Sequence, residues 1–385
     1  MSPRKILVLH ASAGAGHTQA ALAVVEALGA HDPAPELLVA DALQFSTPIF
    51  RRTYVASYNN IVRRAPGLWG FLYRRTSGRR FDRGTAPARL TFDQLSVRRL
   101  RAYLRRERPD AVLCTHFLPL ALLSHLRLKD PDAHPWPLYV AITDYTAHPF
   151  WVFAGVSCYF VSSGNVAEEL AAQGVGGDRV RVTGIPAHPR FARRGDASEA
   201  RLRLGLNPGA PTVLVMGGGI GMGHLEKVVE RVLHTDPAYQ CIAVCGRNAR
   251  LRRALQARYE EAEERDGRIA IRGFVKDVDR LMDAATLVVS KAGGLTTAES
   301  LAKGLPMLVL DPIPGQEERN CNFLEAAGAG IRLADLDDLG PRLREVLGPG
   351  GRLSLMRAAA TLVSRPMAAQ NIAELVLGGA GVSAS

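Results

Sequence analysis

The chain has 385 residues, and its content of 47% hydrophobic and 22% charged residues excludes a wholly disordered or collagen-like protein. No apolar run reaches the roughly 18 residues that a membrane-spanning helix needs, so we expect no transmembrane segment. The formal net charge is +11. This excess of positive charge alone does not identify whether the partner is nucleic acid, a membrane surface or another anion.

The N-terminal segment imitates a signal peptide, but its apolar stretch is too short and His10 interrupts it, so we predict a β-strand there and a cytoplasmic protein. Apolar strand-like runs then alternate with helix-like segments along the chain. These runs are Lys5–His10, Leu37–Asp41, Ala111–Thr115, Leu138–Thr143, Cys158–Ser162, Val180–Thr183, Thr212–Met216, Cys241–Cys245, Ile269–Ile271, Leu287–Ser290 and Met307–Asp311. The pattern indicates parallel sheets covered on both faces, and we predict two α/β domains joined within Gly184–Pro211.

A strongly basic stretch runs from Arg51 to Arg108. It holds sixteen arginines against Asp82, Asp93 and Glu107, which is 16 − 3 = +13, and aromatic residues are interleaved with them. This pattern suits an anionic membrane surface or nucleic acid. A solvated, arginine-rich helical face is the alternative.

Each half of the chain has a glycine loop between a strand and a helix. The first is Gly14-Ala15-Gly16-His17, and the second is Gly217–Gly223 followed by His224, which predicts two Rossmann-like units. Such loops let backbone N–H groups approach a phosphate at the positive end of a helix. The G-x-G-x-x-G fingerprint fails at Gln19 and Met222, and no Walker A lysine follows, so we predict phosphate or pyrophosphate binding without NAD or ATP.

His17 is the strongest catalytic candidate. It follows the glycine turn at the C-terminal end of the first predicted strand, where open α/β sheets bind ligands. An imidazole can accept a proton from an acceptor hydroxyl near neutral pH. A structural histidine at a helix start is the alternative, and His224 is expected to be a phosphate neighbour or a structural residue.

Polar groups also follow two predicted strands of the second half. Glycines there allow close backbone approach, and a glutamate can accept hydrogen bonds from a ribose diol. The groups are Gly293, Gly294, Thr296, Thr297 and Glu299 after Leu287–Ser290, and Gln316, Glu317 and Asn320 after Met307–Asp311. Carboxylates in a first helical turn also stabilise the helix dipole, and that reading stays open.

No metal and no resident cofactor are predicted. The five cysteines form no CxxC pair and are expected to be buried and reduced. The D-x-D patterns Asp277–Asp279 and Asp335–Asp337 each lie beside a helix-like segment, where aspartate favours helix starts and turns.

Taken together, these motifs resemble the monogalactosyldiacylglycerol-synthase and processive diacylglycerol-glucosyltransferase family, a branch of the family 28 glycosyltransferases. The matching segments are Ser12–His17, Pro66–Tyr73, Thr143–Trp151, Val182–Pro186, Met216–Gly219, Ser290–Glu299 and Pro314–Asn320. The resemblance implies an α/β architecture with the GT-B fold, in which two Rossmann-like domains face each other across a cleft. We expect an acceptor and membrane domain over 1–190, a linker over 191–211, a UDP-sugar domain over 212–364, and a C-terminal helix with tail over 365–385 that crosses back.

The resemblance also implies residue roles, with His17 as the catalytic base. Donor binding is implied for Gly217, Gly218 and Gly219 at the pyrophosphate, Phe274 and Val275 at the uracil, Gly293, Gly294 and Thr297 nearby, Glu299 at the ribose, and Gln316, Glu317 and Asn320 at the sugar. The acceptor and membrane side is implied for Gly16, Asp144, Trp69, Phe71, Tyr73, Arg74 and Arg75. Arg319 replaces a glycine that the family commonly has, so the donated sugar stays open.

The implied function is inverting transfer of glucose or galactose from a UDP-sugar, which is a substrate, to diacylglycerol or a related membrane lipid. The product is a β-glycolipid. The protein would work as a peripheral protein on the inner face of the cell membrane, with anionic lipid and no nucleic acid as partner. Two alternatives stay open: an N-acetylglucosamine transferase acting on an undecaprenyl-pyrophosphate-linked lipid, and a non-catalytic nucleotide-sugar-binding membrane protein.

Overall fold

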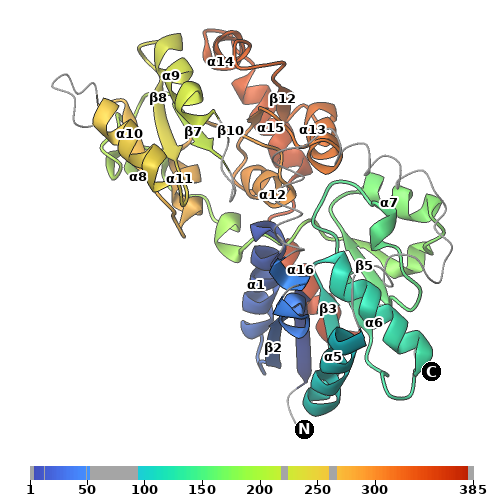
Figure 1. The fold of residues 1–385 in the computed structure, drawn as a ribbon. Coiled ribbons are helices and arrows are strands. Elements are labelled where there is room, and N and C mark those ends of the chain that lie inside the picture. Colours follow the sequence, from blue (N-terminus) through green and yellow to red (C-terminus); the bar gives the residue numbers. More distant parts are fainter. Residues whose placement is uncertain are drawn as a thin grey trace. The chain divides into compact units, whose positions relative to one another are not determined.

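The computed structural model describes residues 4–12, 14–48, 50–52, 94–217, 224–259 and 267–379 (Figure 1). The chain divides into two compact units. The first unit comprises residues 1–189, 314–316 and 367–385, and the second comprises residues 190–313 and 317–366. The 3-10 helix η4 (Pro189–Ala192) carries the chain from the first unit to the second.

The first unit is built on a six-stranded parallel sheet with strand order β2-β1-β3-β4-β5-β6. The strands are β1 (Lys5–His10), β2 (Glu36–Asp41), β3 (Ala111–Cys114), β4 (Leu138–Ala141), β5 (Cys158–Val161) and β6 (Val180–Val182). Every residue of β3, β4 and β5 is buried, as expected for apolar runs covered on both faces.

Helices cover both faces of this sheet. They are α1 (Ala15–Gly29), α5 (Gln94–Glu107), α6 (Phe117–Lys129), α7 (Gly164–Ala172) and α16 (Ala368–Leu377), with short 3-10 helices η1 (Ala42–Phe45), η2 (Pro149–Trp151) and η3 (Gly177–Arg179). Val8 of β1 packs with Val24 of α1 and Ile372 of α16. The next strand residue, Leu9, points to the opposite face, since side chains alternate along a strand, and it belongs to a core cluster with residues of α5, α6 and α7.

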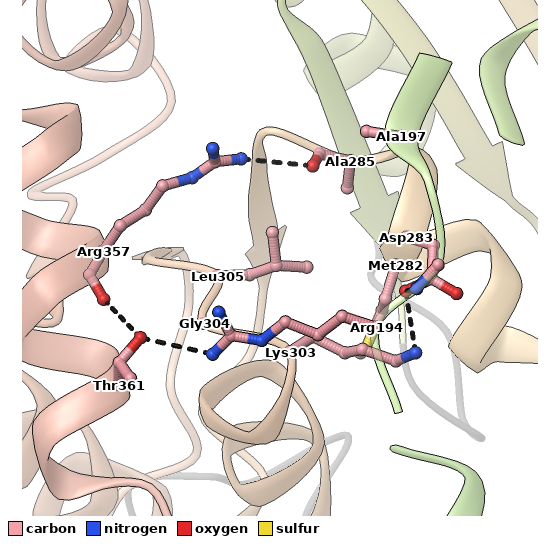
Figure 2. A pocket seen from close by; sticks show the side chains of 11 residues that line it. Arg194, Ala197, Met282, Asp283, Ala285, Lys303, Gly304, Leu305, Arg357 and Thr361 are labelled. Atoms are coloured by element: carbon pink, nitrogen blue, oxygen red, sulfur yellow. Dashed lines mark hydrogen bonds and ion pairs between the residues drawn. The ribbon is translucent and has the colours of Figure 1, made fainter. Parts of the chain in front are cut away.

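The second unit holds another six-stranded parallel sheet, with strand order β12-β11-β10-β7-β8-β9. Its strands are β7 (Thr212–Met216), β8 (Gln240–Val244), β9 (Ile269–Arg272), β10 (Leu287–Ser290), β11 (Met307–Val309) and β12 (Gly330–Arg332). Its helices are α8 (Ala197–Leu202), α9 (Leu225–Thr235), α10 (Ala249–Tyr259), α11 (Val278–Ala284), α12 (Gly294–Ala302), α13 (Gln316–Ala326), α14 (Leu339–Leu347) and α15 (Leu353–Val363). A cavity lies beside α11, the end of α12 and α15 (Figure 2).

All eleven predicted strands are present, with ends that differ by at most two residues. One strand, β12, was missed because its three residues follow a glycine-rich turn and offer no apolar run of strand length.

The five cysteines are buried and free, as predicted, and Cys241 and Cys245 belong to the same hydrophobic core.

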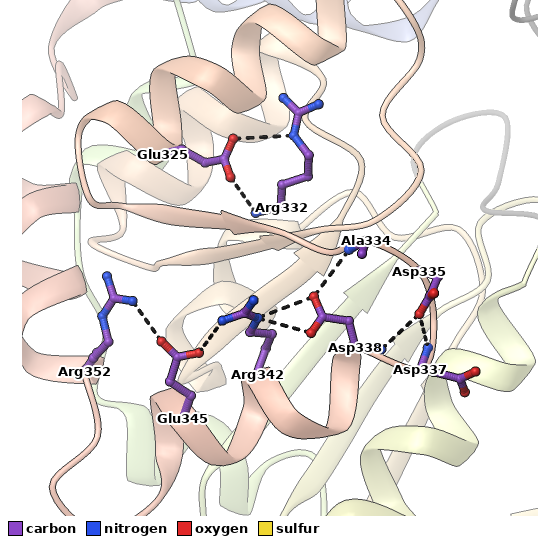
Figure 3. A network of polar contacts seen from close by, with 9 residues as sticks. All are labelled: Glu325, Arg332, Ala334, Asp335, Asp337, Asp338, Arg342, Glu345 and Arg352. Atoms are coloured by element: carbon purple, nitrogen blue, oxygen red, sulfur yellow. Dashed lines mark hydrogen bonds and ion pairs between the residues drawn. The ribbon is translucent and has the colours of Figure 1, made fainter.

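The two D-x-D patterns have the structural surroundings expected from the sequence. Asp335 Oδ1 accepts the backbone N–H groups of Asp337 at 2.8 Å and Asp338 at 3.1 Å, which forms the turn before α14 (Figure 3). Asp279 is the second residue of α11 and lies 3.1 Å from Arg190 Nε as an ion pair. Asp335 therefore shapes the turn before α14, and Asp279 lies in the first turn of α11, whose N-cap Asp277 makes no side-chain cap hydrogen bond.

Both sheets reverse their winding direction beside their first strand. In the first unit β1 lies between β2 and β3, and in the second unit β7 lies between β8 and β10. The helices that follow the two neighbouring strands leave in opposite directions at such a point, which opens a crevice outside the carboxyl ends of the strands. The residues after β1 and β3, and those after β7 and β10, therefore stand where ligands bind.

Candidate functional site

His17 is the third residue of α1, and it lies at the crevice between β1 and β3. Its Nδ1 atom is 2.9 Å from the carbonyl oxygen of Thr115, the residue that follows β3. The Thr115 hydroxyl in turn donates to the His17 carbonyl at 2.8 Å. These two bonds fix the start of α1 and the imidazole ring against the end of the neighbouring strand.

The contacts of Nδ1 determine which nitrogen carries the proton. A carbonyl oxygen can only accept a hydrogen bond, so the contact with Thr115 requires a proton on Nδ1. The Thr143 hydroxyl oxygen is also 2.9 Å from Nδ1 and accepts from the same N–H. The lone pair of the neutral ring then lies on Nε2, to which no side chain or backbone group of the described residues donates.

The surroundings of His17 keep its imidazole neutral. Burial lowers the pKa of His17 to about 4, while the hydrogen bond to the Thr115 carbonyl opposes this shift and a charge on His10 would add to it. The His116 ring meets the His17 ring edge-on at 4.5 Å between centroids, and the Trp151 ring lies 6.3 Å away. Burial also lowers the pKa of His116 well below its ordinary value. Uncharged and aromatic side chains therefore surround a neutral imidazole whose Nε2 can accept a proton.

Sequence reasoning missed four members of this group: Thr115, His116, Thr143 and Trp151. Thr115 and Thr143 were the last residues of two predicted strands, so the order of the strands in the sheet would have brought both to His17, whereas Trp151 lay in a matching segment and at no strand end. Of the two predicted acceptor residues that the structure describes, Gly16 precedes His17 in α1, and Asp144 directly follows Thr143.

In the second unit, the predicted donor residues follow β7, β9, β10 and β11, and the glycines among them follow β7 and β10, which are adjacent strands. Gly217 is buried at the end of β7. After β10, Gly293 precedes α12, whose first turn has no side-chain cap. The orphan N–H groups and the dipole of a helix start suit an anion such as a pyrophosphate.

Glu317 and Asn320 hold the turns after β10 and β11. The Asn320 side chain is fully buried, and its Nδ2 donates to the Ala292 carbonyl at 2.9 Å. Glu317 Oε2 accepts the Ile313 N–H at 2.7 Å. Gln316, the first residue of α13, is half-buried. A contact of these residues with a donor sugar stays a prediction.

Glu299 and Thr297 lie on the same helix, α12. Burial raises the pKa of Glu299 to about 8, while Arg190 opposes the shift and Asp279 adds to it. The Thr297 hydroxyl is completely buried and has no hydrogen-bond partner among the described residues. On α12, the Thr297 hydroxyl is thus a buried polar group that a ligand could satisfy.

Phe274, predicted at the uracil, is 63% exposed, which is unusual for a large aromatic side chain. The Arg247 guanidinium lies 5.3 Å from the centre of its ring, and the neighbouring Val275 is half-buried. The ring therefore offers a stacking surface next to a positive charge.

Gly294 is the buried first residue of α12. Seven predicted site residues lie outside the described part of the chain: Gly218, Gly219, Trp69, Phe71, Tyr73, Arg74 and Arg75. Of the basic stretch, α5 is described, and it buries Leu100 and Leu104 while Arg98, Arg105 and Arg106 are exposed. None of the described helices is long and apolar enough to cross a membrane. Within the same described ranges, no group of three or more His, Cys, Asp or Glu side chains is arranged to hold a metal.

Comparisons with known proteins agree with this architecture. Residues 17–187 match the family model for monogalactosyldiacylglycerol (MGDG) synthase, and residues 212–366 match the glycosyltransferase family 28 C-terminal domain. The processive diacylglycerol beta-glucosyltransferase of Staphylococcus carnosus is 29% identical over 345 residues, which cover 86% of this chain and 81% of that protein. The probable monogalactosyldiacylglycerol synthase 2, chloroplastic, of Oryza sativa subsp. japonica is 32% identical over 350 residues, covering 85% and 70% of the two chains.

The structure of Acinetobacter baumannii MurG aligns with a TM-score of 0.63 at 16% identity, over 98% of this chain and 100% of that one. At this identity the likeness shows the fold alone. Together with the two parallel six-stranded sheets, it confirms the predicted GT-B fold.

Proposed function

The chain belongs to the monogalactosyldiacylglycerol-synthase family of hexosyltransferases, and from this premise we propose that it transfers a hexose from a UDP-sugar to diacylglycerol with His17 as the general base. The observation that carries the assignment of the base is the hydrogen bond from His17 Nδ1 to the Thr115 carbonyl. This bond leaves the lone pair on Nε2, where a general base needs it.

In the proposed step, His17 Nε2 takes the proton of the acceptor hydroxyl. The hydroxyl oxygen forms a bond to the anomeric carbon while the bond from that carbon to the UDP oxygen breaks, and UDP leaves with the electron pair. A single displacement converts an α-linked donor into a β-glycoside. The positive charge that develops on the ring strengthens the Nδ1–H bond to the Thr115 carbonyl, because a charged donor makes a stronger hydrogen bond.

We assign donor binding to the second unit. The start of α12 and the loop after Gly217 would stabilise the pyrophosphate as negative charge develops on the leaving group. Glu299 would hold the ribose hydroxyls, Phe274 would stack on the uracil, and Gln316 and Glu317 would contact the sugar. Acceptor binding is assigned to the first unit, around Gly16 and Asp144.

We further propose peripheral binding to an anionic membrane on the inner face of the cell membrane. The exposed arginines of α5 support this proposal, because they continue the basic stretch whose aromatic members include Trp69, Phe71 and Tyr73. Flotation with phosphatidylcholine liposomes, with and without phosphatidylglycerol, tests it. Binding that needs no anionic lipid would contradict it.

A donor screen tests the activity. The protein is mixed with diacylglycerol in phosphatidylglycerol liposomes and with UDP-glucose, UDP-galactose or UDP-N-acetylglucosamine, and UDP release and lipid products are followed. We expect a monohexosyl lipid with β linkage from one of the two hexose donors. Measurable UDP binding without a glycolipid product from any donor would contradict the proposed acceptor.

A further inference from the structure

A cavity with a volume of about 190 Å³ lies in the second unit, at the C-terminal end of α12. Its lining comes from the segment before α8, from α11, from the turn after α12 and from α15 (Figure 2). Of the predicted donor residues, Gly293 and Gly294 lie at the other end of α12, roughly 13 Å away at 1.5 Å per residue over its nine residues, and Glu299 lies four residues before Lys303. The cavity therefore lies at the opposite end of α12 from the proposed pyrophosphate site.

Basic side chains dominate the polar lining of the cavity. Arg194, Lys303 and Arg357 face a single carboxylate, that of Asp283, which gives a net charge of 3 − 1 = +2. Lys303 Nζ pairs with Asp283 Oδ1 at 2.8 Å, and the Lys303 side chain is only 2% exposed. This pair leaves the guanidinium groups of Arg194 and Arg357 without a carboxylate in the cavity.

The contacts of the two guanidinium groups leave donors unused. Arg357 Nη2 donates to the Thr286 carbonyl at 3.2 Å, but its buried Nε has no partner among the described residues. Arg194 Nη2 donates to the Thr361 hydroxyl at 3.2 Å. Burial lowers the pKa of Arg357, and the charge of Arg194 lowers it further. Arg194 is exposed, so the cost falls on Arg357, whose buried Nε donor stays unsatisfied unless an anion accepts from it.

Gly304 allows its backbone to lie close to the Arg194 guanidinium group. Its φ is +68°, and a Cβ atom at this position would lie 2.7 Å from Arg194 Nη2 and 3.1 Å from Thr361 Oγ1. The Arg194 guanidinium therefore contacts the backbone of Gly304, and a side chain at position 304 would displace it. Together with the cavity and its charge, this contact describes a preformed anion site.

We propose that the cavity binds a phosphate monoester, either a free metabolite or the headgroup of a lipid. A monoester carries close to two negative charges near neutral pH, which matches the net +2 of the lining. Guanidinium groups bind phosphate oxygens with strong charge-assisted hydrogen bonds. The volume of about 190 Å³ has room for roughly six water molecules at about 30 Å³ each, which is the size range of a headgroup such as glycerol phosphate.

The first test is calorimetric titration of the full chain with glycerol 3-phosphate in saturating UDP, which occupies the donor site. We expect binding to persist in UDP and to weaken about tenfold or more in Arg194→Gln, because one charge-assisted contact is lost. Arg357→Gln should act in the same direction, with folding checked by circular dichroism since Arg357 also bonds to Thr286. The matched control is Arg253→Gln, an exposed arginine of α10, which should bind like the unchanged protein.

The second test distinguishes the source of the phosphate. Flotation uses phosphatidylcholine vesicles that carry either phosphatidic acid, a monoester, or phosphatidylglycerol, a diester. A loss of binding in Arg194→Gln confined to phosphatidic acid assigns the site to a lipid headgroup, and a loss confined to glycerol 3-phosphate assigns it to a free metabolite. Binding that UDP abolishes, or that Arg194→Gln and Arg357→Gln leave unchanged in both experiments, would overturn the proposal.

Discussion

His17 Nδ1 and the Thr115 carbonyl oxygen are 2.9 Å apart, although 98 positions separate the two residues in the sequence. The pairing of β1 with β3, in which Leu9 lies opposite Cys114, brings them together. The orientation of the imidazole is therefore fixed by backbone atoms at the winding reversal of the sheet.

Replacing His17 tests its role as the base. His17→Gln should lower kcat about 10²–10⁴-fold, the usual contribution of a general base. The dissociation constant of UDP should stay within about twofold, because UDP binding is assigned to the second unit. A twofold change corresponds to about 0.4 kcal/mol, less than one hydrogen bond usually contributes. Transfer rates and equilibrium binding check this. An equal loss of both would instead give His17 a structural or donor-binding role, and His125→Gln, an exposed histidine of α6, is the control.

Thr143 is a positioning residue for His17. Thr143→Val removes the hydroxyl that lies 2.9 Å from His17 Nδ1 and keeps the shape of the side chain. We expect kcat to fall about tenfold with KM for the UDP-sugar unchanged, since roughly one hydrogen bond is lost. Thr143→Ser should restore most of the rate. A Val variant that reacts as fast as the unchanged protein would show that the Thr143 hydroxyl does not position His17.

The pH dependence follows from the pKa of His17, which burial lowers to about 4 from 6.5. Between these values the unfolded chain binds a proton and the folded one does not, so stability is complete above about pH 6.5 and is lost toward pH 4. Urea unfolding at pH 7 and pH 4.5 should show about 2 kcal/mol more loss in the unchanged protein than in His17→Gln. A loss of equal size in both would mean that His17 titrates normally.

Much of the fold could be predicted from the sequence because its strands are continuous apolar runs, such as Leu138–Ala141, separated by helices. The candidate site was only partly predictable. His17 and Glu299 could be predicted because each is a titratable residue that follows a predicted strand. Thr115 and Thr143 contact His17 through a carbonyl oxygen and a hydroxyl, and only the order of the strands in the sheet brings these groups to His17. The basic cavity had no local pattern at all, since Arg194, Lys303 and Arg357 come from separate segments.

Glu299 should make UDP binding depend on pH. Its pKa is raised to about 8, mainly by burial, and a carboxylate accepts two hydroxyl hydrogens better than the neutral acid does. The affinity for UDP should therefore rise from pH 7 to pH 9, and Glu299→Ala should weaken it about tenfold at pH 9 and remove this trend. Titration calorimetry at the two pH values measures both effects. Glu345→Ala on α14 is the control, and an unchanged affinity in Glu299→Ala would refute the ribose assignment.

Gly304 and Gly205 form a matched pair that separates backbone strain from crowding. Their φ values are +68° and +75°, but an added Cβ would lie 2.7 Å from Arg194 Nη2 at Gly304 and would meet nothing within 4 Å at Gly205. Both alanine variants should lose about 1–2 kcal/mol of unfolding free energy, which is the cost of a left-handed backbone for an L-residue. Because Arg194 is exposed and its far end can move, the extra crowding should change stability little.

The crowding should instead appear in ligand binding. Gly304→Ala displaces the Arg194 guanidinium from the backbone it rests on, so the affinity for glycerol 3-phosphate in saturating UDP should fall as in Arg194→Gln, about tenfold. Gly205→Ala should bind normally at the same loss of stability. Equal affinities in the two alanine variants would mean that Gly304 does not position Arg194, and the preformed state of the cavity would need another explanation.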